Sequence, residues 1–122
     1  MPALILIVED DTALAATLEI ALLQLPEVET TILHDGRQAV QFLENATVLP
    51  SAVLTDLDLP RVDGYELIRW MRAQPAMLRL PVVAMSARND SKGALAAGAD
   101  RFVGKPYSLA AVREILKELM NA

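Results

Sequence analysis

Short, mostly apolar runs alternate with helical patterns along the whole chain. The runs expected to form strands are, in order, Leu4–Val8, Val28–Leu33, Ala52–Thr55, Val82–Met85 and Arg101–Val103. Apolar residues at helical spacing follow each run and predict helices over Thr12–Leu23, Arg37–Glu44, Tyr65–Arg72, Ser91–Ala97 and Ser108–Met120. Strands that alternate with helices in this way are typical of a parallel sheet covered on both faces. The pattern therefore predicts an α/β fold of five strand–helix units.

Residues that favour helix ends support these boundaries. Asp11 stands where it can cap the first helix, and Ser108 opens the last one. Gly98 fits the position just after a helix, where a left-handed backbone is common. Pro26 and Pro75 follow predicted helices, which proline cannot continue.

Length and composition indicate one domain. The 122 residues are enough for a self-sufficient core, and 53% of them are hydrophobic. The longest apolar runs, such as Pro2–Val8, are far shorter than the roughly 20 residues that cross a bilayer. The N-terminus lacks the features of a secretory signal, and cysteine is absent. We expect a cytoplasmic protein without a membrane partner.

The charge balance argues against direct binding of nucleic acid. The chain has 16 acidic and 11 basic residues, so its net charge is −5, and no stripe of lysine and arginine is present. Phosphate backbones favour concentrated positive charge. Aromatic residues, at 4%, also offer few surfaces on which bases could stack.

Reactive side chains stand at the ends of four predicted strands. Glu9-Asp10-Asp11, Asp56, Ser86 and Lys105 would meet at the carboxyl edge of one sheet, where open parallel sheets bind ligands. Carboxylates, a hydroxyl and an ammonium gathered there indicate a divalent metal ion and a phosphoryl group, since unscreened carboxylates repel one another. Taken alone, the acidic run is equally typical of a helix N-terminus, and we assign Asp11 to that role.

Four sequence strings occur in the order of a known family. They are Val8-Glu9-Asp10-Asp11, Asp56-Leu57-Asp58-Leu59-Pro60 with Asp63-Gly64, Met85-Ser86-Ala87, and Gly98-Ala99-Asp100 with Lys105-Pro106. Together they resemble the receiver domain of two-component response regulators, and the resemblance covers nearly all of residues 1–122. It implies a flavodoxin-like, doubly wound, five-stranded parallel sheet of order 2-1-3-4-5 with five helices.

The resemblance implies a phosphorylation site and a metal site. Asp56 matches the aspartate that is phosphorylated, and Asp10 matches the acid that binds the metal ion. Glu9 matches the neighbour that reaches the ion through water, and Asp58 lies where a main-chain carbonyl completes the ligands. Oxygen ligands of this kind suit Mg²⁺ or Mn²⁺. In the family, the main chain at Leu57, Asp58 and Ala87 contacts the phosphoryl group.

The resemblance also implies the remaining site residues. Lys105 matches the lysine that contacts the acidic cluster and then the phosphoryl oxygens, and Pro106 matches a cis-proline. Ser86 matches the hydroxyl that binds the phosphoryl group, and the small Ala87 leaves room for that group. Phe102 matches the aromatic residue that moves inward with Ser86 as a switch. Because phenylalanine has no hydroxyl to satisfy, it can favour the inward position without that signal.

These residues lead to three functional hypotheses. The first is a phosphoacceptor receiver that takes a phosphoryl group from a histidine kinase or phosphotransfer protein onto Asp56, without turnover of a separate substrate. A downstream protein would then bind the side formed by the fourth helix, fifth strand and fifth helix. The second is a phosphohydrolase, since Asp56-x-Asp58 also resembles the motif of haloacid-dehalogenase-type enzymes. The third is a pseudo-receiver that only binds partners.

Two further expectations concern regulation. Arg101, Ala111 and Ile115 depart from the charged pairs through which winged-helix regulators dimerise, so we expect no dimer of that type. The chain is interpreted as a stand-alone receiver or as a part of a hybrid kinase or larger regulator. Asp58 and Arg88 are expected to form an ion pair at the mouth of the site, screening the phosphorylated aspartate from water.

Overall fold

The computed structural model describes residues 2–121 and contains one five-stranded parallel sheet. The strand order is β2-β1-β3-β4-β5, which confirms the predicted flavodoxin-like topology. The strands are β1 (Ala3–Val8), β2 (Val28–Leu33), β3 (Ala52–Asp56), β4 (Val82–Ser86) and β5 (Arg101–Gly104). The helices are α1 (Thr12–Leu22), α2 (Gly36–Asn45), α3 (Gly64–Arg72), the 3₁₀ turn η1 (Pro75–Met77), α4 (Ser91–Ala97) and α5 (Leu109–Asn121).

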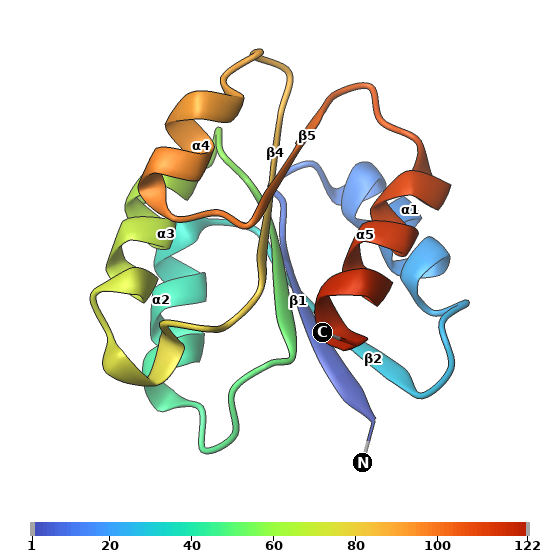
Figure 1. Cartoon of the computed structure of the whole chain (residues 1–122), viewed down its shortest axis with the longest axis horizontal. Coiled ribbons are helices and arrows are strands. Elements are labelled where there is room, and N and C mark those ends of the chain that lie inside the picture. Colours follow the sequence, from blue (N-terminus) through green and yellow to red (C-terminus); the bar gives the residue numbers. More distant parts are fainter. Residues whose placement is uncertain (1, 122) are drawn as a thin grey trace.

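Helices cover both faces of the sheet, as Figure 1 shows. Alternate residues of β1 point to opposite faces, so Ile5 and Ile7 join the core beneath α1 and α5, whereas Leu6 and Val8 join the core beneath α2, α3 and α4. All four side chains are fully buried. Burial on both faces explains why the central strands β1, β3 and β4 are mostly apolar runs rather than alternating patterns.

Strands β3 and β4 extend one residue further than the sequence pattern indicated. Asp56 pairs with Met85 and Ser86 pairs with Gly104, so both polar residues still belong to the sheet. The prediction ended each strand at the last apolar residue, because hydrophobicity carries no information on hydrogen bonding beyond that residue. Because Asp56 and Ser86 belong to the hydrogen-bonded strands, the sheet fixes the backbone conformation of both residues.

Aspartates begin four of the helices. The side chains of Asp11, Asp35, Asp63 and Asp90 each accept a hydrogen bond from a main-chain amide in the first turn of α1, α2, α3 and α4. Each of these caps anchors the loop that leaves the carboxyl end of a strand. The loops that follow β1, β2, β3 and β4 are therefore held at both ends.

The described helices are too short or too polar to cross a lipid bilayer.

Candidate functional site

The reactive side chains predicted from the sequence come together at one edge of the sheet. The carboxyl ends of the strands lie at the top of Figure 1, where each continues into the loop before the next helix. Glu9 and Ser86 are fully buried, and Asp56 is 3% exposed. Asp10, by contrast, is exposed to solvent. The site thus combines buried polar groups with one carboxylate at its surface.

Lys105 joins the two buried carboxylates. Its Nζ donates hydrogen bonds to Asp56 Oδ2 at 2.7 Å and to Glu9 Oε1 at 3.0 Å. The main-chain amide of Lys105 donates to the carbonyl oxygen of Ser86, and the Lys105–Pro106 peptide bond is cis. Because buried carboxylates are costly without a partner, this ammonium supports the ionised state of the cluster.

Three carboxylates are close enough to share one cation. Glu9, Asp10 and Asp56 each offer an oxygen, and these oxygens lie within 4.8 Å of one another. Mg²⁺ and Mn²⁺ prefer oxygen ligands and keep several waters, so a cluster that is open on the Asp10 side fits such an ion. These three carboxylates belong to the ligand set expected from the sequence, which also included the main-chain carbonyl of Asp58, and the full ligand set stays a prediction.

The pKa values of Glu9 and Lys105 are both raised in this cluster. Burial raises the pKa of Glu9 to about 7, and the negative charge of Asp56 adds to the rise, whereas the hydrogen bond from Lys105 opposes it. The same two carboxylates raise the pKa of Lys105, although its burial works in the opposite direction. Lys105 therefore stays charged at neutral pH, when Glu9 is close to half protonated.

The second oxygen of Asp56 is held by the loop that follows it. The main-chain amide of Asp58 donates to Asp56 Oδ1 at 3.0 Å. Gly64, the first residue of α3, packs so closely on this loop that an added Cβ would lie 2.3 Å from the main-chain oxygen of Asp56. Glycine is needed here because any side chain would displace the loop. Leu57 is buried, and its amide bonds to the carbonyl of Met85.

Ser86, Asp58 and Arg88 form a second, more exposed group. Ser86 Oγ donates to Asp58 Oδ2 at 3.0 Å and accepts from the main-chain amide of Arg88, also at 3.0 Å. The Arg88 guanidinium pairs with Asp58 Oδ1, which is the ion pair that the sequence predicted. Ala87, which lies between Ser86 and Arg88 in the chain, is exposed to solvent. Phe102 is half-buried and packs against the core on the α4 side.

Sequence reasoning missed some of the neighbours of the site. The Nδ1 atom of His34 lies 3.0 Å from the carbonyl oxygen of Glu9, at the end of β2. The only sequence signal was that His34 directly follows a strand at the same edge. Tyr107 has a buried hydroxyl without a hydrogen-bond partner among residues 2–121, and burial raises its pKa to about 12.

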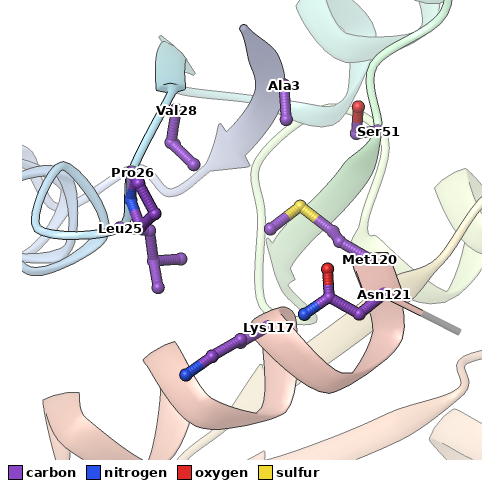
Figure 2. Close-up of a pocket in the computed structure, with 8 residues that line it drawn as sticks. All are labelled: Ala3, Leu25, Pro26, Val28, Ser51, Lys117, Met120 and Asn121. Carbon is purple, nitrogen blue, oxygen red and sulfur yellow. The ribbon is translucent and has the colours of Figure 1, made fainter.

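One groove lies beside this site, and one cavity lies away from it. A largely apolar groove of about 500 Å³ runs between α1 and the loop before α5, and Ala87 and Lys105 belong to its lining. A smaller cavity of about 230 Å³ is shown in Figure 2, where Lys117 and Asn121 of α5 border the hollow. Its lining includes Ala3, the first residue of β1, so it lies at the opposite edge of the sheet. Of these two, the groove is the one that adjoins the site, through Lys105 and Ala87.

A family model and curated relatives both relate this chain to response regulators. The family model described as response regulator receiver domain matches residues 5–117. The KDP operon transcriptional regulatory protein KdpE of Escherichia coli is 38% identical over 93% of this chain and 49% of its own length. This chain spans about half the length of the curated relatives that it matches.

Solved structures extend this similarity. The receiver domain of the sensor histidine kinase PA1611 from Pseudomonas aeruginosa has a TM-score of 0.88, 32% identity and full coverage of both chains. That structure holds a magnesium ion in its active-site cleft. The signal receiver domain of a signal transduction histidine kinase from Syntrophus aciditrophicus has a TM-score of 0.87 and 32% identity, covering 98% of this chain and 90% of that one.

Proposed function

Because this chain belongs to the response regulator receiver domain family, we propose that Asp56 accepts a phosphoryl group in a reaction that requires Mg²⁺ or Mn²⁺. The observation that carries the proposal is the contact of Lys105 with both Asp56 and Glu9, at the carboxyl edge of the sheet. A buried aspartate beside a cation and further carboxylates can act as a nucleophile once its charge is balanced. Other members of the family are phosphoacceptors in two-component signalling.

The chemical step transfers a phosphoryl group from an oxygen or nitrogen atom of the donor to a carboxylate oxygen of Asp56. A carboxylate oxygen of Asp56 attacks phosphorus, a new P–O bond forms, and the bond from phosphorus to the donor breaks. The electron pair of that bond leaves with the donor. A divalent ion held by Glu9, Asp10, Asp56 and the main-chain carbonyl of Asp58 would supply positive charge that offsets repulsion between the carboxylate and the phosphoryl oxygens.

The protein supplies the remaining contacts. Lys105 neutralises Asp56 before the reaction and then contacts the transferred phosphoryl oxygens. Ser86 Oγ turns from Asp58 toward the phosphoryl group, and the main-chain amides of Asp58 and Ala87 offer further donors. The amide of Leu57, which the resemblance had added to these donors, is already bonded to the carbonyl of Met85 in this structure. The half-buried Phe102 follows Ser86 inward, so the state of Asp56 alters the side of the molecule formed by α4, β5 and α5. A downstream protein partner recognises that side.

A histidine kinase or phosphotransfer protein is the proposed donor. The outward face of α1 is uncharged and largely apolar, and the exposed residues of this helix and its C-cap are Thr12, Ala13, Ala16, Thr17, Ile20 and Leu23. Ile20 is 66% exposed and Leu23 is 51% exposed. Thr17 also lines the groove that reaches Lys105. Apolar patches of this kind mark interaction sites, and this one adjoins the phosphorylation site.

The alternative functions make different demands on Asp58. A phosphohydrolase of the haloacid-dehalogenase type needs this carboxylate free as a general acid and base, whereas here it bonds to Ser86 and Arg88. Two assays separate the hypotheses. Sustained turnover of small phosphate esters would identify an enzyme. Labelling with acetyl phosphate separates the other two, because a receiver carries at most one phosphoryl group per chain at any time and a pseudo-receiver remains unlabelled.

We expect the affinity for Mg²⁺ to depend on pH through Glu9. Because burial raises the pKa of Glu9 to about 7, its carboxyl is mostly protonated below that pH, and ion binding must displace the proton. Affinity should rise by up to about tenfold per pH unit below pH 7 and level off above it. Isothermal titration calorimetry in buffers of different ionisation enthalpy would measure both the affinity and the protons released.

The variant Glu9→Gln is the control for this pH dependence. It should bind Mg²⁺ more weakly and with little dependence on pH between 6 and 8. An equally steep dependence in Glu9→Gln would assign the proton to another group and contradict the prediction.

Removing Arg88 is expected to shorten the lifetime of the phosphorylated state. The Asp58–Arg88 pair stands at the mouth of the site, where it hinders the approach of water to the phosphorylated Asp56. Exposed pairs are weak, so Arg88→Ala should speed loss of the phosphoryl group by a few-fold, below about tenfold. Salt screens such pairs, and the rate in the variant should therefore depend less on salt.

The exposed Arg79, which lies between η1 and β4, provides the matched control. Arg79→Ala changes the net charge equally and should leave the lifetime unchanged. Decay that is unchanged or slower in Arg88→Ala at low salt would leave the pair without this role.

A further inference from the structure

Tyr65 connects two helices beside the site without taking part in the proposed chemistry. It is the second residue of α3, and its hydroxyl donates to Asp90 Oδ2 at 2.6 Å. Asp90 caps α4, since its Oδ1 accepts from the main-chain amide of Gly93 at 3.1 Å. The hydrogen bond from Tyr65 lowers the pKa of Asp90, which keeps this carboxylate charged. The ring of Tyr65 is thereby held at a fixed place between the starts of α3 and α4.

Arg88 lies across that ring. Its guanidinium carbon is 6.0 Å from the centroid of the Tyr65 ring, at the outer limit of a cation–π contact. The same guanidinium pairs with Asp58, which also accepts the hydrogen bond of Ser86. The Arg88 side chain is 64% exposed, so little else restricts its conformations. The charge of Asp90 adds attraction from the same side as the ring.

These contacts form a continuous link from the start of α4 to the mouth of the phosphorylation site. Asp90 fixes Tyr65, the ring of Tyr65 orients Arg88, and Arg88 holds the carboxylate of Asp58. An arginine without such a support would sample many rotamers and leave Asp58 for much of the time. The ion pair at the mouth is thus linked to the start of α4 through the ring and the hydroxyl of Tyr65.

We propose that Tyr65 is a positioning residue that holds Arg88 against Asp58 and thereby lengthens the lifetime of the phosphoryl group on Asp56. The inference rests on the proposed phosphorylation of Asp56. The ring and the hydroxyl of Tyr65 have separate roles. The ring lies beside the Arg88 guanidinium, and the hydroxyl fixes the ring through its hydrogen bond to Asp90. Tyr65→Leu removes both, whereas Tyr65→Phe keeps the ring and loses only the bond to Asp90.

The test is a double-mutant cycle on the rate of phosphoryl loss. The unsubstituted chain, Tyr65→Leu, Arg88→Ala and the double variant are labelled with acetyl phosphate and Mg²⁺, the donor is removed, and decay is followed by phosphate-affinity electrophoresis at low salt. Tyr65→Leu should speed decay by nearly the same few-fold factor as Arg88→Ala. The double variant should decay no faster than Arg88→Ala alone, because Tyr65 acts only through Arg88.

Further variants separate positioning from a general loss of structure. Tyr65→Phe should restore most of the lifetime lost in Tyr65→Leu. Trp70→Leu alters another aromatic residue of α3 that lies outside this link and should leave the lifetime unchanged. Thermal unfolding measures any loss of stability, which should not follow the order of the decay rates.

Three results would overturn the inference while leaving the proposed function intact. They are an unchanged lifetime in Tyr65→Leu, an equal acceleration by Tyr65→Leu with and without Arg88, and a lifetime in Trp70→Leu as short as in Tyr65→Leu. If the unsubstituted chain takes no label at all, the proposed function itself is wrong, and the inference falls with it.

Discussion

Acetyl phosphate is expected to label Asp56 only when Mg²⁺ or Mn²⁺ is present. Glu9, Asp10 and Asp56 bring their oxygens within 4.8 Å of one another, and Lys105 provides one positive charge against them. An incoming phosphoryl dianion would add further negative charge to this cluster. A divalent ion offsets that repulsion, so chelation by EDTA should abolish labelling. Intact-protein mass spectrometry would detect the added phosphoryl group.

Variants of neighbouring aspartates make this experiment specific. Asp56→Asn should take no label, and Asp10→Asn should lose both metal binding and label. Asp11→Asn is the matched control, because asparagine still caps α1 and the residue stands next to Asp10 on the same loop. It should be labelled normally. Undiminished labelling of Asp56→Asn would show that the phosphoryl group goes elsewhere.

Replacing Lys105 should separate phosphorylation from metal binding. The ammonium bonds to Asp56 and Glu9, so Lys105→Met removes the charge and keeps most of the apolar stem. Loss of one preorganised donor to a transferring group slows such reactions on the order of 100-fold. The rate of labelling by acetyl phosphate at saturating Mg²⁺ should fall by that order.

Affinity for Mg²⁺ should move in the opposite direction in the same variant. Without the ammonium, the oxygens of Glu9 and Asp56 are free of a competing cation, so binding should be unchanged or tighter. Lys92→Met, on the exposed side of α4, is the matched control and should alter neither quantity. A large loss of Mg²⁺ affinity in Lys105→Met, or a normal rate of labelling, would contradict the role of Lys105.

The order of the elements was predictable from local patterns. The strands are short and separated by helical patterns, and the central strands β1, β3 and β4 are largely buried, so the order of the elements followed from the hydrophobic pattern. Boundaries shifted by a residue where polar side chains take part in regular structure, as at Asp56 and Ser86. The turn η1 was missed because a 3₁₀ turn that starts at Pro75 has no periodic signal.

The sequence by itself determined which chemical groups stand at the carboxyl ends of the strands, because strand ends can be located from apolar runs and parallel strands end at one edge. Only the tertiary structure decided which groups touch. Lys105 meets Glu9 across 96 residues of chain, and Tyr65 meets Asp90 across 25. Ser86 bonds to Asp58, and His34 reaches the carbonyl of Glu9. Such partners depend on the course of short polar loops and on side-chain rotamers, which have no periodic pattern in the sequence and are fixed by packing.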